Sequence, residues 1–383
     1  MRLRIMHVIR SLEKGGGEKI CLDICNELSL RDNVDVMLVS MNPTNHFPEL
    51  TKNINYTVCN AFVRLSLTGK SEINTDSFLA LVNDFKPHVI HSHLFWSELM
   101  SRESTLPKIK YVTHCHDNMV QFEPFSLKTL FSKKRFTQFY ERLWILNKYK
   151  KCDNHFIAIS KDTEAYFKRV LPASLRKIKL LPNAINYSVY FDPKQKTIDR
   201  SQKIKLINIG RFAVYKNQQF LLSVIKKLLD RGIDVELTFL GDGPEKNNVE
   251  EQVKMLGLKN NVFFKGNVSN VSEILHQHHI YVHSSISEAF GLVLLEAMAA
   301  GLPVVALDAK GNRDIVINGK NGFLIDLPNS DCFTEKVVEL VNTPFLYQQC
   351  SSFSKEFSAT YDIKNYTDNL IDFYTEIINC PTP

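Results

Sequence analysis

Two glutamates, Glu288 and Glu296, stand eight residues apart in the stretch Ser284–Gly301, which reads SSISEAFGLVLLEAMAAG. A strand-like run, Ile280–Ser284, precedes them, and the apolar residues after Gly291 are typical of a helix that begins there. The first N–H groups of such a helix have no partner inside it and lie at the positive end of its dipole. They suit an anion such as a phosphate, and a glycine lets the ligand approach the backbone. The pattern therefore predicts a site for a polyol carried on a phosphate.

The same stretch also fits an ordinary core helix. The runs Leu292-Val-Leu-Leu and Ala297-Met-Ala-Ala are apolar enough to lie in a core, with Glu288 as a capping acid and Glu296 as a surface acid. The spacing of the two acids alone does not separate a core helix from a ligand site. The surrounding residues have to decide between them.

A loop with two cations, Gly210–Asn217, follows another strand-like run directly. Arg211 offers a planar fork of hydrogen-bond donors, and Lys216 adds a compact cation five residues later. Together they suit the spread negative charge of a diphosphate, which two such cations would neutralise without a metal ion. Solvated surface charges are the ordinary alternative for an Arg and a Lys this close in a loop.

Glycine-rich turns follow strand-like runs at three further places. Gly15-Gly-Gly lies at the carboxyl end of the first strand and precedes an amphipathic helix, which is where ligands bind in open α/β sheets. It is not a G-x-G-x-x-G fingerprint, so a dinucleotide site has weak support, and a plain flexible turn is the alternative. Gly241-Asp-Gly-Pro and Gly266-Asn-Val have the composition of ordinary turns.

Histidines gather at two strand ends, as His91 and His93 in HSH and as His114 and His116 in HCHD. Because side chains alternate along a strand, each pair shares one face of the sheet near its carboxyl edge. Hydrogen-bonded structural roles are the ordinary interpretation. Zinc binding is the other, although no Cys or carboxylate completes a ligand set. A later histidine group is expected to be structural, because a helix-to-strand change near residue 279 would point its members in different directions. Its members are His276, His278, His279 and His283.

These candidate residues need rigid elements to position them, and strand-like and helix-like segments alternate along the chain. Such alternation predicts parallel sheets with helices on both faces. Strands are predicted in the first half at Arg4–Ile9, Val34–Ser40, Asn55–Cys59, His88–His93, Lys110–Cys115, His155–Ser160 and Ile178–Leu181. Strands are predicted in the second half at Lys205–Gly210, Val235–Gly241, Asn261–Lys265, Ile280–Ser284, Pro303–Leu307 and Gly322–Ile325.

The length of 383 residues exceeds the usual size of one core, which predicts two domains. The periodicity lapses between 186 and 203, so the boundary belongs there. We predict an N-terminal Rossmann-like domain over 1–186, a linker over 187–203, a C-terminal Rossmann-like domain over 204–360 and a terminal helix over 361–383. The fold class is α/β, with two doubly wound parallel-sheet domains facing across a cleft that holds the site.

Composition and charge bound the class of protein. An apolar content of 44% with 23% charged residues is typical of a soluble globular protein. We find no secretion signal and no apolar stretch of the ~20 residues that a membrane span needs, so a cytoplasmic location is predicted. The eight cysteines have no metal-like spacing and are expected to be reduced thiols.

A basic and aromatic segment lies at 125–151, within a first half that is more basic than the second. Such a segment suits peripheral contact with an anionic membrane, where each surface Lys or Arg contributes ~1 kcal/mol. The alternative is a core helix with solvated charges opposite its apolar stripe. That stripe would be Phe136, Phe139, Tyr140 and Leu143. No motif for nucleic-acid binding accompanies the charge, and no nucleic-acid partner is predicted.

The spacing of the two glutamates resembles the E-x7-E signature of the retaining glycosyltransferases of family 4, which have the GT-B fold. Gly301-Leu-Pro-Val-Val and Asn321-Gly-Phe-Leu are similar to that family too, and Gly210–Lys216 matches its G-R-x4-K pattern. The likeness runs through most of the chain and is strongest from about Lys205 to Leu324. It implies a terminal helix that crosses back onto the first domain.

The resemblance also assigns roles to residues of this chain. Arg211 and Lys216 would bind the donor pyrophosphate. Glu288 would hold hydroxyls of the donor sugar, and Glu296 those of the ribose. His116 would contact the transferred sugar, so it is preferred over the other histidines at the strand ends.

Turn residues complete the set that the resemblance implies. Gly16 and Gly17 would border the donor diphosphate and the acceptor, and the turn that contains Asn267 and Val268 would border the nucleotide base. The predicted catalytic residues are Glu288, His116, Arg211 and Lys216. The predicted donor-binding residues are Gly16, Gly17, Arg211, Lys216, Gly241, Asn267, Val268, Glu288, Phe290, Gly291, Leu292, Val293 and Glu296.

The predicted activity is transfer of a hexose or N-acetylhexosamine from a nucleoside-diphosphate sugar, with UDP favoured over GDP, to a glycan or a lipid-pyrophosphate-linked glycan. The resemblance implies retention at the anomeric carbon, no metal and no cofactor. It also implies a role in surface polysaccharide biosynthesis (capsule, O-antigen or exopolysaccharide) at the inner face of the cytoplasmic membrane. The alternatives are a nucleotide-sugar epimerase of GT-B architecture, a sugar phosphorylase or inverting transferase, and a non-catalytic nucleotide-sugar-binding subunit.

Overall fold

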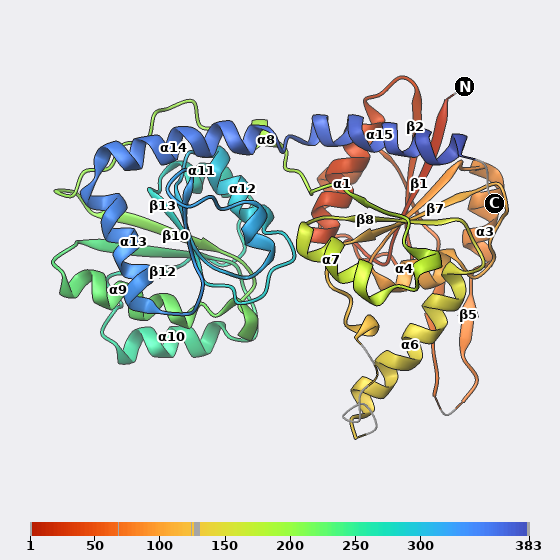
Figure 1. Cartoon of the computed structure of the whole chain (residues 1–383), viewed down its shortest axis with the longest axis horizontal. Helices are drawn as coiled ribbons and strands as arrows, with labels where there is room; N and C mark the ends of the chain where they lie inside the picture. Colours follow the sequence, from red (N-terminus) through yellow and green to blue (C-terminus); the bar gives the residue numbers. More distant parts are fainter. Residues whose placement is uncertain (1, 68, 124, 126–130, 381–383) are drawn as a thin grey trace. The chain divides into compact units, whose positions relative to one another are not determined.

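The computed structural model describes residues 2–67, 69–123, 125 and 131–380, and the chain divides into two compact units. The first unit comprises Met1–Ala184 and Ile363–Pro383, and the second comprises Ile185–Asp362. Each unit is built on its own parallel sheet (Figure 1). The predicted α/β class with two parallel-sheet domains is confirmed.

The sheet of the first unit has seven strands within the described residues, in the order β3-β2-β1-β6-β7-β8-β9. All neighbours pair in parallel, and the chain runs from β1 outward to β3 before it returns to β6 beside β1. This is the doubly wound pattern. The strands are β1 (Leu3–Ile9), β2 (Val34–Ser40), β3 (Asn55–Val58), β6 (Val89–His93), β7 (Lys110–Cys115), β8 (Asn154–Ala158) and β9 (Ile178–Leu180). Each lies within two residues of a predicted strand.

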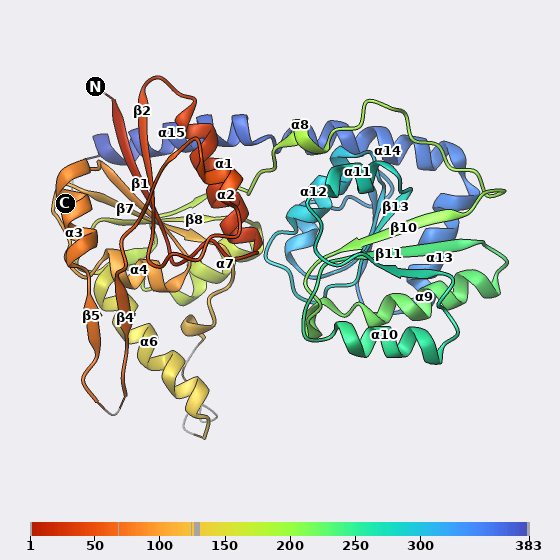
Figure 2. The same cartoon turned by 180° about the vertical axis from the view of Figure 1, so that it is seen from behind.

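Helices pack on this sheet as the strand alternation requires. Met6 and Val8 enter an apolar core with Ile90, while His7 and His91 lie on the opposite face. On that face α1 packs against α15 (Figures 1 and 2). The helices of this unit are α1 (Gly16–Ser29), α2 (Pro48–Thr51), α3 (Asp76–Phe85), α4 (Phe95–Ser101), α6 (Lys133–Tyr149), α7 (Lys161–Val170) and α15 (Ile363–Asn379).

The terminal helix α15 belongs to the first unit, although it follows the second unit in the sequence. Apolar and aromatic side chains at helical spacing hold it there, because they form one buried stripe. The members of the stripe include Tyr366, Leu370, Phe373, Tyr374 and Ile377. Arg31, in the turn that follows α1, forms an ion pair with Asp368 of α15 at 2.9 Å.

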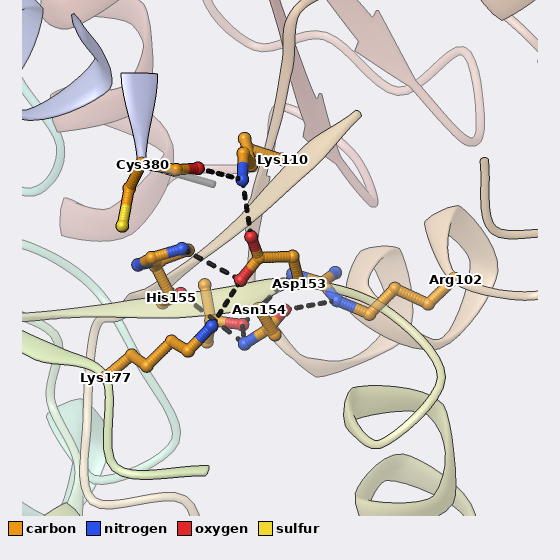
Figure 3. A network of polar contacts seen from close by, with 8 residues as sticks. Arg102, Lys110, Asp153, Asn154, His155, Lys177 and Cys380 are labelled. Atoms are coloured by element: carbon orange, nitrogen blue, oxygen red, sulfur yellow. Dashed lines mark hydrogen bonds and ion pairs between the residues drawn. The ribbon is translucent and has the colours of Figure 1, made fainter. Parts of the chain in front are cut away.

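A charged network fixes the amino ends of the central strands (Figure 3). Asp153, just before β8, accepts hydrogen bonds from Nζ of Lys110 at 2.6 Å and from Nζ of Lys177 at 2.6 Å. Lys110 also donates to the carbonyl of Cys380, beyond the end of α15. Burial alone would raise the pKa of Asp153, but the two lysines outweigh it and lower that pKa to about 2. The network therefore ties three strands and the chain terminus together.

Two features of the first unit differ from the sequence prediction. Short antiparallel strands β4 (Phe62–Arg64) and β5 (Glu72–Asn74) pair as a hairpin that no pattern predicted. Helix α6 has Ser132 as its N-cap, whose hydroxyl accepts from the N–H of Arg135, and a core helix with one apolar stripe was one of the two interpretations that the sequence left open.

The core-helix alternative for α6 is wrong at two of its four stripe residues. Phe136 and Leu143 are 43% and 51% exposed, while the buried apolar residues Ile145 and Tyr149 lie nearer the helix end. The reason is geometric, because α6 contacts α4 with its last turns while its first turns project away from the sheet (Figure 2). Of the basic segment 125–151, residues 126–130 lie outside the described residues.

The described residues of the second unit form a six-stranded parallel sheet in the order β12-β11-β10-β13-β14-β15. This order is again doubly wound, and every predicted strand is present within one residue of its predicted ends. The strands are β10 (Ile204–Ile209), β11 (Val235–Leu240), β12 (Val262–Phe264), β13 (Ile280–His283), β14 (Val304–Leu307) and β15 (Gly322–Ile325). The helices are α8 (Tyr187–Tyr190), α9 (Gln219–Asp230), α10 (Lys246–Met255), α11 (Val271–His276), α12 (Leu292–Ala299), α13 (Ser330–Asn342) and α14 (Pro344–Ala359).

The segment 187–203, which the sequence suggested as a linker, is folded into the second unit. Ile198 is buried in the apolar core of that unit. Lys196 is also buried and forms an ion pair with Asp192 at 3.1 Å. The second unit therefore begins at Ile185, earlier than the polar composition of this segment indicated.

Candidate active site

Three ionisable side chains meet beside the loop that joins β13 to α12. Nζ of Lys216, at the end of the short 3-10 helix Val214–Lys216, lies 2.5 Å from Oε2 of Glu288. Nε2 of His283, the last residue of β13, lies 3.5 Å from the same oxygen. The hydroxyl of Ser284 donates to the carbonyl of Lys216 at 2.8 Å, which fixes the loop against the 3-10 helix.

The charges in this cluster follow from its contacts. Burial alone would raise the pKa of Glu288, but His283 and Lys216 outweigh burial and lower that pKa to about 2. Burial lowers the pKa of His283, and the attraction of Glu288 only partly offsets it. At neutral pH the cluster therefore holds a carboxylate, an ammonium and a neutral imidazole.

Helix α12 begins just after this cluster, as predicted. Gly291 is its N-cap, with φ of 85° and ψ of 55°, a left-handed conformation that favours glycine. The cap offers no side-chain acceptor, and within the part of the chain that the structure describes the N–H groups of Leu292 and Val293 donate to no backbone carbonyl. These amides, four and five residues after Glu288, remain available to an anion.

The second glutamate of the pair, Glu296, also contributes to the electrostatics around Glu288. Glu296 is partly buried on α12. Burial raises the pKa of Tyr281, and the charges of Glu288 and Glu296 add to that rise. Phe290, predicted to bind the donor, has a buried side chain whose ring centroid lies 6.0 Å from that of Tyr361.

Three glycine turns meet at one edge of the second sheet. A Cβ at Gly241, where φ is 130°, would lie 2.1 Å from the carbonyl oxygen of Gly210, so only glycine fits there. The N–H of Gly241 donates to the carbonyl of Gly266 at 2.8 Å. Asn267 and Val268 follow that turn, exposed and half-buried respectively.

Arg211 lies on the first of these turns, with an exposed side chain. Its carbonyl accepts a hydrogen bond from Nε2 of Gln218, which holds the backbone of the loop. Among the described residues, its guanidinium makes no hydrogen bond and no ion pair. The structure thus joins Lys216 to Glu288, while Arg211 stays outside that contact.

In the first unit, the structure brings His116 and Gly17 together. A Cβ at Gly17 would lie 3.4 Å from Nδ1 of His116. Gly16 is the first residue of α1 and Gly15 its N-cap, so the triple glycine forms the start of the helix. The sequence placed the helix after these glycines, and this expectation is corrected. On its other side, Nε2 of His116 lies 2.8 Å from Nδ1 of His93.

Three groups of side chains in the described residues have ligand atoms within 4.8 Å of one another. They are His7, His91 and His93; His93, His114 and His116; and His7, Cys21 and Cys25. The third group contains none of the histidines that the sequence singled out, and it forms because α1 brings two cysteines to His7. In the other groups the rings stack, as His114 does on His116 at 4.2 Å with an interplanar angle of 11°.

The later histidines divide into two kinds. His276, His278 and His279 each hydrogen bond a different neighbour, which confirms the predicted structural roles. The partners are the carbonyl of Tyr190, the hydroxyl of Thr238 and the N–H of Lys205, respectively. His283 was expected to be structural as well, but it contacts Glu288.

Two family models match the chain in succession. The model described as Glycosyltransferase Family 4 matches residues 14–189. The model described as Glycosyl transferases group 1 matches residues 191–357. The chain belongs to the glycosyltransferases.

Relatives of this glycosyltransferase carry related names. N-acetyl-alpha-D-glucosaminyl L-malate synthase of Bacillus anthracis is 30% identical over 187 residues, which are 47% of this chain and 49% of that protein. An uncharacterized glycosyltransferase of Haemophilus influenzae is 27% identical over 375 residues, 91% of this chain and 93% of that protein. The match spans about half the length of the first relative and nearly all of the second.

A solved structure establishes the fold type of the glycosyltransferase. The crystal structure of HepE from Anabaena in complex with UDP-glucose is similar with a TM-score of 0.78 at 19% identity. The similarity covers 98% of this chain and 100% of that chain. The fold is therefore GT-B, as the sequence predicted.

The sequence did not predict one contact of the site, that of His283 with Glu288. His283 ends a predicted strand, and the signal that could have found it is the five-residue distance to Glu288 across a short loop. No helix in the described part of the glycosyltransferase has the length and apolar character to cross a bilayer.

Proposed function

We propose that this glycosyltransferase moves a hexose or an N-acetylhexosamine from a nucleoside-diphosphate sugar to a hydroxyl of a glycan or lipid-linked glycan. The observation that carries the proposal is the ion pair of Lys216 with Glu288 beside the open first turn of α12. A cation and free amides suit a diphosphate, and the neighbouring carboxylate suits sugar hydroxyls. The UDP-glucose in the HepE complex supports UDP over GDP as the nucleotide.

The proposed reaction retains the configuration at the anomeric carbon. The bond from that carbon to the diphosphate oxygen breaks, the bond to the acceptor oxygen forms on the same face, and the leaving phosphate takes the acceptor's proton. Lys216, Arg211 and the amides of Leu292 and Val293 stabilise the charge that develops on the diphosphate, usually the largest contribution to such catalysis. With two cations in this role, the reaction needs no metal ion.

The remaining predicted residues bind the rest of the donor in this proposal. Glu288 holds hydroxyls of the sugar and Glu296 those of the ribose. His116 of the first unit contacts the transferred sugar. Gly16 and the other glycines leave room for the ligand.

The test is transfer by the purified protein from a panel of UDP- and GDP-sugars to glycan acceptors, with product configuration read by NMR. Glu288→Ala should lower kcat by about 100-fold or more, since a charged group in contact with the reacting sugar is lost. Glu335→Ala removes an exposed carboxylate of the same unit, paired with Arg231, and should leave kcat unchanged. Normal transfer by Glu288→Ala, or dependence on added metal after chelation, would contradict the proposal.

The alternatives give different products in the same assay. A nucleotide-sugar epimerase forms a new sugar from the donor without any acceptor. A sugar phosphorylase consumes phosphate, and an inverting transferase gives the opposite anomer. A non-catalytic subunit would bind UDP-sugars, seen as a raised melting temperature, without hydrolysis or transfer.

We infer that the acceptor side works at an anionic membrane, as surface polysaccharide assembly at the inner face of the cytoplasmic membrane requires. Helix α6 supports this, because its exposed apolar side chains are interleaved with exposed cations. The exposed apolar residues are Phe136 and Leu143 of the helix and Phe131, which lies just before it. The exposed cations at the helix start are Lys133, Lys134 and Arg135.

Sedimentation with vesicles tests the membrane contact. Binding should require phosphatidylglycerol in phosphatidylcholine vesicles and should weaken as salt rises. The double substitution Phe131→Ser with Phe136→Ser should abolish it. Phe345→Ser removes an aromatic residue of the second unit that is 70% exposed, and should have no effect. Equal binding by both variants would exclude α6 as the contact.

A further inference from the structure

Imidazole rings in the first unit form one continuous hydrogen-bonded chain that the proposed reaction does not account for. Within the described residues it joins five histidines through one tyrosine and ends on an asparagine. In order, its members are His116, His93, His7, Tyr374, His91, His114 and Asn183. We call it the histidine chain.

The strands explain why the rings meet. His7 on β1 lies opposite His91 on β6, and His93 on β6 lies opposite His114 on β7. All four side chains are completely buried on one face of the sheet. Neighbouring rings stack with centroids 4.6 Å apart for His91 and His93 and 4.2 Å apart for His114 and His116.

The first half of the histidine chain runs from His116, beside Gly17, into the core of the first unit. Nε2 of His116 lies 2.8 Å from Nδ1 of His93, and Nε2 of His93 lies 2.8 Å from Nδ1 of His7. Nε2 of His7 then lies 3.4 Å from the hydroxyl of Tyr374 on α15. In each of these three links, Nε2 of one ring lies within hydrogen-bond distance of the next polar atom along the chain.

The second half continues in the same sense. The hydroxyl of Tyr374 lies 2.5 Å from Nδ1 of His91, and Nε2 of His91 lies 3.2 Å from Nδ1 of His114. Nε2 of His114 lies 3.0 Å from Oδ1 of Asn183. An amide oxygen only accepts hydrogen bonds, so it fixes the direction of the whole chain.

Counting protons along the chain gives one arrangement. A neutral imidazole has one N–H donor and one acceptor nitrogen, so His114 must donate from Nε2 and accept at Nδ1. The same holds in turn for His91, then for His7 through the tyrosine hydroxyl, and then for His93. His116 therefore carries its proton on Nε2, and its Nδ1 is left as an acceptor.

The rings are neutral for a physical reason. Burial lowers the pKa of His7 to about 3 and that of His114 to about 4, and it holds the pKa values of His91, His93 and His116 well below their usual range. A proton added to His93, His7, His91 or His114 would place two donors face to face at one link of the chain. The neutral arrangement is thus the one that satisfies each link.

We propose that the histidine chain is a positioning device that holds His116 in its neutral Nε2–H form, so that Nδ1 is presented as a hydrogen-bond acceptor beside Gly17. That edge of the ring faces the start of α1, since a Cβ at Gly17 would lie 3.4 Å from Nδ1. This proposal rests on the proposed function in one respect: the donor to Nδ1 is a hydroxyl of the transferred sugar. The remaining members act through His116 and do not touch the substrate.

A metal ion is the competing use of the same nitrogens. A bound metal would need the lone pair of a ring nitrogen that the histidine chain already engages. Both nitrogens of His91 and both nitrogens of His93 are engaged by other members of the histidine chain. Metal analysis of the purified protein therefore belongs in the test.

The direct experiment is NMR of the wild-type protein with 15N-labelled histidine. We expect one protonated and one unprotonated nitrogen in each of the five rings at pH 7.5, with the proton on Nε2, and no stoichiometric metal. A proton on Nδ1 of His116, a doubly protonated ring in the chain, or a zinc ion bound to these rings would overturn the proposal.

A matched pair of variants tests the remote control of His116. Tyr374→Phe removes the hydroxyl that links His7 to His91, while Tyr366→Phe removes a buried hydroxyl of the same helix that has no hydrogen-bond partner among the described residues. With the link broken, the part of the chain next to His116 loses its anchor on Asn183. The His116 nitrogen signals should then show both tautomers in Tyr374→Phe and stay unchanged in Tyr366→Phe.

Kinetics separate positioning from a structural role. If about half of the His116 rings adopt the wrong tautomer, kcat/KM falls about twofold or more in Tyr374→Phe, and Tyr366→Phe is unaffected. In a His116→Ala background Tyr374→Phe should cause no further loss. Unchanged His116 signals in Tyr374→Phe would overturn the proposal. Absence of any sugar transfer by the wild type would overturn the proposed function. The NMR result would still decide, independently, whether the histidine chain fixes the tautomer of His116.

Discussion

The glycosyltransferase has two buried polar clusters, one in each unit. In both clusters the pKa values of key groups are lowered, which keeps a carboxylate charged in one cluster and imidazole rings neutral in the other. In the second unit, Lys216 and His283 lower the pKa of Glu288 and keep that carboxylate ionised. In the first unit, burial lowers the pKa values of the histidine chain and keeps those rings neutral. One cluster is held by opposite charges, and the other by hydrogen bonds between neutral groups.

The difference teaches what each cluster can do. When a ligand arrives, the carboxylate and the ammonium of an ion pair can each exchange the other for a group of the ligand. Glu288 and Lys216 therefore suit a site that binds a charged substrate. A chain of neutral donors and acceptors has no net charge to offer, but it has a direction. The histidine chain therefore suits orientation of one group, and the following predictions test this contrast.

The largest expected effect is acid unfolding of the first unit. The unfolded chain binds protons at its histidines below about pH 6.5, whereas the folded histidine chain does not, so stability falls as pH falls. From pH 7.5 to 5.5 the five rings should together cost roughly 7 kcal/mol, comparable to the stability of a whole domain. Glu288 contributes nothing in this window, because its stabilisation is lost only as pH falls from about 4.5 through about 2.

Urea titrations at pH 7.5, 6.5 and 5.5 measure this effect. Both tryptophans, Trp96 and Trp144, lie in the first unit, so their fluorescence reports its unfolding. The midpoint should fall steeply with pH. A midpoint that is constant from pH 7.5 to 5.5 would show that the histidines are not held neutral.

Loss of the ammonium in the charged cluster should have the next largest effect. Lys216→Met leaves the buried carboxylate of Glu288 with His283 as its nearest partner and removes a cation from the diphosphate site. We expect kcat/KM for the nucleotide-sugar donor to fall about 100-fold. Lys227→Met removes a lysine of the same unit from an ion pair with Asp331, and should change kcat/KM less than twofold. Equal, small losses in both variants would mean that the Lys216 ion pair is structural only.

Removal of the neutral partner of Glu288 should cost less. His283→Asn takes away the imidazole that lies 3.5 Å from Oε2 of Glu288 and keeps a small polar side chain in β13. Loss of a contact to a charged group predicts a fall of about tenfold in kcat/KM at pH 7.5. His278→Asn alters another buried histidine of this unit, away from the carboxylate, and serves as the control. If the two variants behave alike, His283 has no role beyond packing.

Much of the fold could be predicted because local sequence determines it. Apolar runs such as Val34–Ser40 and Val304–Leu307 are buried on both faces of parallel sheets, so they stand out without any tertiary information. The start of α12 was predictable because Gly291 directly precedes an apolar run, and the structure shows that this glycine adopts a positive φ. The three-residue strands β4 and β5 are too short to leave such a pattern.

The candidate site was predictable only in part, because some of its contacts depend on the path of the chain. Tyr374 lies 283 residues from His91 in the sequence, so no local pattern joins them. His7 was not singled out, because one histidine in an apolar strand looks ordinary until β6 lies beside it. The sequence left open whether α6 is a core helix or a surface segment, because periodicity predicts a helix face but not how far the sheet beneath it extends.

The smallest expected effect tests the open edge of His116. Gly17→Ala places a Cβ about van der Waals distance, 3.4 Å, from Nδ1 of His116 and so covers the acceptor without a steric clash. Because alanine favours helices, α1 should gain up to ~1 kcal/mol of stability, and the melting temperature should rise. The loss of one hydrogen bond to the sugar predicts a kcat/KM about three- to tenfold lower. Gly69→Ala, at an exposed glycine of the same unit, should leave activity unchanged. A Gly17→Ala protein that is more stable and equally active would show that nothing binds at Nδ1, and the direction of the histidine chain would then have no consequence for the reaction.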